Sequence, residues 1–234
     1  MTLKTMESYL SKLIFLSFIT ICGYAKTNAQ IAISVCADDN DFTISFDNKI
    51  LPSYMQGSNG QFTYSIIFNP PPTPVLVGFN MFTAVNNVNG IFPNLSSLRS
   101  ITVPVPQRIY PHHYTATLLL TDNTTQCSVN YHLQIDVLYP KTILQQKWND
   151  VIGIVSTTYN GGYIVAENDA KYSYQWYHNG RLITAAEAEQ RGSILYLGKG
   201  NTNNYRNLVV GDEYCVAITR SDGTTVRSCP HIAY

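Results

Sequence analysis

Apolar and polar residues alternate from Cys127 to Val137, and this alternation constrains the fold more than any other feature of the sequence. Side chains on an extended chain point by turns to two opposite faces, so the pattern predicts a strand with one buried face. The residues expected on that face are Val129, Tyr131, Leu133, Ile135 and Val137. Short runs of this kind recur throughout residues 30–234 with turn residues between them, which is typical of a sandwich or barrel. We therefore expect an all-β fold.

The recurring runs fall into two sets, one on each side of Tyr139-Pro140. We expect the first set of strands at residues 31–36, 42–46, 62–68, 101–105, 114–121 and 127–137, and the second at 151–155, 163–165, 172–177, 194–197, 214–220 and 224–229. Residues 184–190 are expected to form a helical turn or two. A chain of 234 residues is long enough for two domains that each bury a core. The predicted division is into 30–140 and 141–234.

Residues 1–29 have the layout of a secretory signal peptide. Lys4 and Lys12 precede an apolar run at 13–21, and small residues stand before Gln30. The alternatives are an N-terminal helix of the mature fold, or a lipid-modified Cys22, although Ile21 stands where a lipoprotein signal wants a small residue. The run is too short to span a membrane, so we expect no transmembrane segment in the mature chain. Export to the periplasm, the outer cell surface or the medium is predicted.

Four cysteines remain after such a cleavage, and an even number in an exported chain favours disulfides over metal binding or catalysis. They are Cys36, Cys127, Cys215 and Cys229, and three pairings are possible. We prefer Cys36 with Cys127 and Cys215 with Cys229, because each pair then stays inside one predicted domain. A three-residue turn around Asp222-Gly223 would also place Cys215 opposite Cys229 in the last hairpin.

Two segments of the second half resemble an immunoglobulin-like domain. They are Tyr174-Gln175-Trp176-Tyr177-His178-Asn179-Gly180, which is similar to strand C, and Gly211-Asp212-Glu213-Tyr214-Cys215-Val216, which is similar to a tyrosine corner. The second of the predicted domains departs from the antibody pattern, because it has no cysteine in strand B. We therefore expect two tandem immunoglobulin-like β-sandwiches after the signal peptide.

The stretches around Trp148, Tyr159-Asn160-Gly161-Gly162-Tyr163 and Trp176 together resemble modules of exported and surface proteins of Bacteroidetes. The first half resembles the companion module, with Tyr114 to Leu120 leading to Cys127. The resemblance implies export and an interaction or structural role, and it supplies no catalytic residues. Trp148 lies near the predicted boundary and is interpreted as a packing anchor.

No motif for catalysis or cofactor binding stands out, so we expect neither an enzyme nor a bound cofactor. The formal net charge of zero, without basic runs, argues against nucleic acid as a partner. His112-His113 is the most conspicuous metal candidate, but neighbours on an extended chain face opposite ways, so surface loop is preferred. Asp38-Asp39-Asn40-Asp41 is interpreted as a solvated turn in preference to a calcium loop.

These observations predict a non-catalytic adhesion, surface-structural or protein-interaction module. The alternative is a carbohydrate-binding protein of the same fold, because the 17 tyrosines could stack on sugar rings. The expected partner is therefore a protein or a surface glycan.

Overall fold

The computed structural model describes residues 29–46, 51–56, 58, 60–70, 78–79, 87–94, 97–107, 109–147, 151–154, 157–159, 163–165, 172–184 and 204–234. Over these residues the regular structure is mainly β-strand, with a short α-helix, α2 (Ser53–Gln56), and a 3₁₀ turn at Lys141–Ile143. The predicted all-β class is confirmed. The described part of the chain holds no helix that is both long and apolar enough to cross a membrane. Four predicted features lie outside the described residues. They are the signal peptide up to residue 28, Trp148, the helical turn over 185–190 and the strand at 194–197.

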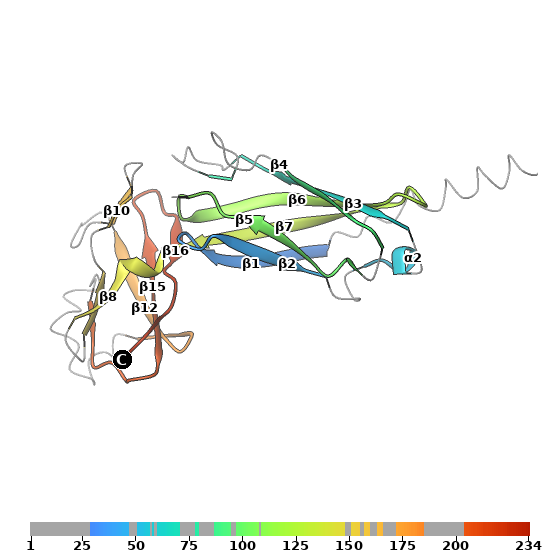
Figure 1. The fold of residues 1–234 in the computed structure, drawn as a ribbon. Helices are drawn as coiled ribbons and strands as arrows, with labels where there is room; N and C mark the ends of the chain where they lie inside the picture. The colour runs from blue at the N-terminus through green and yellow to red at the C-terminus, as the bar shows by residue number, and fades with distance from the viewer. Residues whose placement is uncertain are drawn as a thin grey trace, which may run out of the picture.

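The first half forms two facing sheets, of five strands and two strands (Figure 1). The strands are β1 (Ala29–Cys36), β2 (Asp41–Ser45), β3 (Phe62–Phe68), β4 (Asn87–Phe92), β5 (Ser100–Pro104), β6 (His112–Asp122) and β7 (Ser128–Leu138). The larger sheet has the order β1-β7-β6-β3-β4 and the smaller one pairs β2 with β5. β1 runs parallel to β7, and the other pairs are antiparallel.

Alternation along the strands explains why these sheets face each other. In β7 the five residues expected to be buried are all buried, and the residues between them are exposed or half-buried. β6 alternates in the same way, with Tyr114, Ala116, Leu118 and Leu120 inside. Buried residues of β2 and β5 pack against this face. Together they form one apolar cluster, whose members lie between Val35 and Val137 in the sequence.

The second half repeats the arrangement with shorter strands. They are β8 (Leu144–Lys147), β9 (Val151–Ile154), β10 (Thr157–Tyr159), β11 (Tyr163–Val165), β12 (Ser173–His178), β13 (Arg181–Leu182), β14 (Asn204–Arg206), β15 (Glu213–Thr219), β16 (Thr225–Arg227) and β17 (His231–Ile232). One sheet has the order β14-β9-β8, the other has the order β13-β12-β15-β16 with β17 also paired to β15, and β10 pairs with β11. The buried apolar residues of this half form a second cluster, whose members lie between Tyr139 and Ala233 in the sequence.

Each half contains a tyrosine whose hydroxyl is bonded to the backbone a few residues upstream. The Tyr214 hydroxyl accepts a hydrogen bond from the Val209 amide at 2.9 Å, and the Tyr114 hydroxyl donates one to the Tyr110 carbonyl at 2.7 Å. This is the geometry of a tyrosine corner. Trp176 is buried in mid-strand in β12, opposite Val216 of β15. Both halves therefore have the tyrosine corner of an immunoglobulin-like sandwich, and the second half also has its buried mid-strand tryptophan.

The two apolar clusters meet near Tyr139, and Tyr110 is packed against both of them. Figure 1 shows the second half, coloured from yellow to red, at one end of the longer first half. The division into domains at 30–140 and 141–234 stays a prediction.

Candidate functional site

The junction between the two halves is held by a disulfide that joins Cys36 at the end of β1 to Cys229, with their Cα atoms 5.9 Å apart. Among the described cysteines, Cys215 is a buried free thiol. The predicted pairs, Cys36 with Cys127 and Cys215 with Cys229, are therefore wrong. The disulfide crosses the predicted domain boundary.

The reason lies at the end of the last hairpin. Its register is the predicted one, because the Arg220 amide donates to the Thr224 carbonyl and Ala217 lies opposite Arg227. β16 nevertheless ends at Arg227, and the chain then pairs with Tyr139. The Cys229 amide donates to the Tyr139 carbonyl at 2.9 Å. This pairing brings Cys229 to the end of β1, where Cys36 lies beside Leu138.

Arg220 extends from the end of β15 into the first half and is almost fully buried. Its Nε donates to the Tyr139 hydroxyl at 3.1 Å and its Nη2 donates to the Pro111 carbonyl at 2.5 Å. The guanidinium also lies over the Tyr110 ring, 4.3 Å from its centre, which is a cation–π contact. The sequence offered no signal for this role, because an arginine before an Asp-Gly turn is ordinarily solvated.

His112 and His113 begin β6 and do not lie in a surface loop, so that interpretation is wrong. His113 Nδ1 lies 2.7 Å from an Asp136 carboxylate oxygen, and Nε2 lies 2.9 Å from the Thr225 carbonyl of the second half. Burial lowers the pKa of His113, but the hydrogen bonds to Asp136 and Thr225 together raise it above its ordinary value. His112 points the other way and is buried.

The acidic turn after β1 also contacts the second half. The Lys141 amide donates to the Asp38 carboxylate at 3.2 Å, and Lys141 Nζ lies 3.0 Å from Asp39. The other Asp39 oxygen accepts the Cys36 amide. The carboxylates considered for calcium thus bind the backbone and side chain of Lys141.

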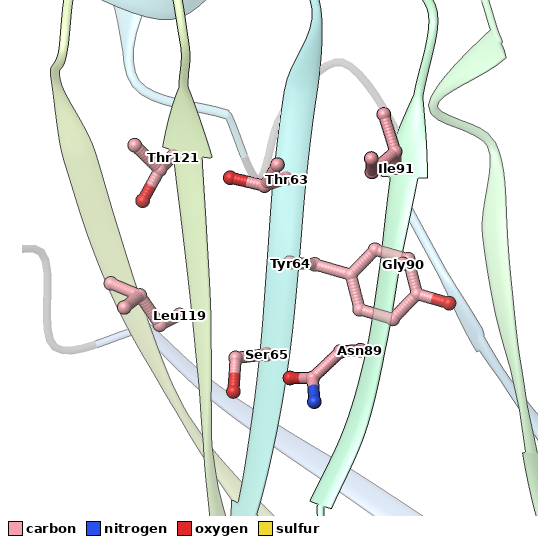
Figure 2. Close-up of a pocket in the computed structure, with 8 residues that line it drawn as sticks. All are labelled: Thr63, Tyr64, Ser65, Asn89, Gly90, Ile91, Leu119 and Thr121. Atoms are coloured by element: carbon pink, nitrogen blue, oxygen red, sulfur yellow. The ribbon is translucent and has the colours of Figure 1, made fainter.

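A hollow lies on the outer face of the larger sheet, where β3, β4 and β6 run side by side (Figure 2). It is an open groove with a volume of about 480 Å³. Its lining residues carry no charge and are Thr63, Tyr64, Ser65, Asn89, Gly90, Ile91, Leu119 and Thr121. Ile91 and the neighbouring Ile67 have exposed fractions of 61% and 50%, which is high for large apolar side chains.

Gly90 lies opposite Tyr64, and the Tyr64 ring occupies the place of the missing Gly90 side chain on the core-facing side of the sheet, behind the groove. A Cβ atom at residue 90 would lie 2.4 Å from the Tyr64 ring. That ring also packs against Phe92 with 5.3 Å between centres. The strand carrying Gly90 was not expected from the sequence, since Asn and Gly are poor strand formers.

Replacing Gly90 with alanine is expected to displace the Tyr64 ring and to lower the free energy of unfolding by about 1–3 kcal/mol through overpacking. The measurement is urea unfolding of the variant and of a double variant that also carries Tyr64→Ala. The double variant should recover part of the loss, because the obstructing ring is gone. Equal and additive losses would show that the two residues do not interact.

Comparison with known proteins finds no matching family model and no matching curated relative. Several solved structures are similar in outline. The FN1–FN3 domains of chicken CNTN1 are 9% identical with a TM-score of 0.29, and the match covers 88% of this chain and 62% of that one. Fibronectin(III)-like modules of Clostridium thermocellum CbhA are 8% identical with a TM-score of 0.25, covering 89% and 88%. The Pseudomonas aeruginosa CupB2 chaperone is 10% identical with a TM-score of 0.23, covering 87% and 97%.

This chain thus spans less than two thirds of the CNTN1 structure. Since the TM-scores are low, the fold class rests on the strand orders, buried faces and tyrosine corners described above. They define an all-β protein built from immunoglobulin-like sandwiches.

Proposed function

We propose that the chain is a non-catalytic, exported adhesion, surface-structural or protein-interaction module. The observation that carries this proposal is the open, uncharged groove on β3, β4 and β6 with Ile91 exposed at its side. Uncharged, partly apolar surface of this kind is what a protein partner can cover without desolvating charges. β4 is also the last described strand of its sheet.

A short histidine–carboxylate contact in the second half supports a structural role for His178 and Asp212. His178 Nε2 lies 2.6 Å from an Asp212 oxygen, and the imidazole stacks on the Tyr214 ring at 4.7 Å between centres. Tyr214 in turn holds the Val209 amide. The pair therefore braces the tyrosine corner.

Export is part of the proposal. The disulfide between Cys36 and Cys229 is of the kind that persists in an oxidising compartment, and residues 1–29 have a signal-peptide layout. The resemblance to Bacteroidetes surface modules points the same way. The junction contacts would hold the two halves in one orientation and so present the groove at a fixed angle.

Carbohydrate binding is the second candidate, favoured by the hydroxyl and amide groups of Thr63, Ser65 and Asn89 on the outer face of the sheet. Sugars are bound through polar groups of this kind. A sugar would depend on Asn89, whereas a protein partner would depend on the exposed apolar side chains.

The test is a screen of the exported chain, with its disulfide intact, against surface proteins and a glycan array. For a captured protein, Ile91→Asp is expected to weaken binding about tenfold or more, because a buried charge opposes apolar contact. Val210→Asp is the matched control, since Val210 is exposed to 71% in the other half. Saturable glycan binding lost on Asn89→Ala and unchanged by Ile91→Asp would favour the second candidate. Equal losses from Ile91→Asp and Val210→Asp would contradict a role for the groove.

A further inference from the structure

His112 closes one end of the first apolar cluster. It shares a face of β6 with Tyr114 and Ala116, and its ring meets the Tyr114 ring edge-on with 5.6 Å between centres. Its exposed fraction is 4%. Neither ring nitrogen has a hydrogen-bond partner among the residues that the structure describes. A buried imidazole in this state costs stability, so its presence at the junction calls for an explanation.

The charged groups around His112 come mainly from the second half. Arg220 donates to the carbonyl of Pro111, the residue directly before His112, and Asp222 lies in the turn that follows Arg220. On its own strand the neighbour is His113, which is paired with Asp136. From β7, the residue opposite His112 is the uncharged Val137. Burial raises the pKa values of Tyr110, Tyr114 and Tyr139, so these nearby phenols stay neutral.

Burial, Arg220 and His113 lower the pKa of His112, and Asp222 only partly offsets them. The neutral ring therefore tolerates the guanidinium beside it, whereas a charged ring would face a second positive group with little water between them.

We propose that this junction is a proton-sensitive joint, in which charging His112 expels Arg220 from its site and loosens the orientation of the two halves. The disulfide between Cys36 and Cys229 keeps the halves linked while the Arg220 contacts to Tyr139, Pro111 and Tyr110 are lost. In neutral solution the joint is fixed. In acid it becomes mobile without the chain separating.

The direction with pH follows from the lowered pKa of His112. Its contribution to stability is present above its ordinary pKa of 6.5 and is lost as the pH falls through the lower, folded value. His113 acts in the opposite sense, because its pKa is raised and its pairing with Asp136 is complete in acid. That pair is about half exposed, so its effect is small. His231 also has a pKa lowered by burial and lies in β17.

The test is hydrogen exchange at the Tyr139 and Cys229 amides, which bridge the junction, between about pH 7.5 and about pH 5. After correction for intrinsic exchange, protection should fall by up to about tenfold per pH unit below the ordinary pKa of His112. His112→Phe should abolish this fall, because its ring cannot be charged. His231→Phe, the matched control, should behave as the unmodified protein.

A second measurement does not depend on variants folding. The imidazole C–H signal of His112 in the unmodified protein should titrate below the ordinary value, and the Tyr139 amide signal should shift with the same midpoint. Far-UV circular dichroism should stay unchanged in that range, because the strands remain intact while the joint loosens. The proposal is overturned if protection is independent of pH, if His112→Phe loses protection as the unmodified protein does, or if the two midpoints differ.

Discussion

Replacing Cys36 with serine is expected to lower the free energy of unfolding by about 5 kcal/mol. The bond to Cys229 closes a loop with a sequence separation of 193 residues, and the loss of chain entropy in the unfolded state grows with the length of the loop. Urea unfolding under non-reducing conditions measures the change.

Cys215→Ser is the control, and its effect should be on the order of 1 kcal/mol, since it alters a buried thiol without breaking a bond. Peptide mapping of the oxidised protein checks the connectivity directly. A peptide pair joining Cys215 to Cys229 would contradict the structure and restore the pairing expected from the hairpin.

Replacing Arg220 with methionine is expected to cost about 3 kcal/mol of unfolding free energy. Methionine keeps much of the apolar stem but removes the donors to Tyr139 and Pro111, and a buried acceptor without its donor is costly. Chemical denaturation gives the magnitude.

Arg227→Met is the matched control, because Arg227 lies in the same hairpin and also covers an aromatic ring, that of Tyr177 at 4.1 Å. Arg227 is exposed, so its loss should cost less than about 1 kcal/mol. Similar losses for the two arginines would show that the hydrogen bonds to the first half contribute little.

The features that could be predicted are those set by local pattern. The alternation in 127–137 identified a strand and its buried face, and Asp222-Gly223 identified the register of the last hairpin. The order of Trp176 and Tyr214 suggested the immunoglobulin-like sandwich. In each case the signal and the structure lie within a few residues of each other.

The features that could not be predicted depend on contacts distant in sequence. Cys229 reaches Cys36 only because Tyr139 pairs with Ser228 through a single bridge, which leaves no periodic signal. Arg220 resembles any solvated arginine until Tyr110 and Tyr139 are placed around it. β4 contains Asn and Gly and would have been read as a turn, so the groove that it borders had no signature.

The disulfide at the junction also determines where a mechanical pull would act. Tension that enters the chain ahead of Cys36 and leaves it beyond Cys229 passes from one sulfur to the other and bypasses the residues between them. The strands between the two cysteines then bear almost none of the stretching force, and only β1 and β17, which lie outside the closed loop, stay in its path. An oxidised molecule held between two surfaces could therefore extend only through these end segments, whereas a reduced one could unravel over the full 193-residue separation.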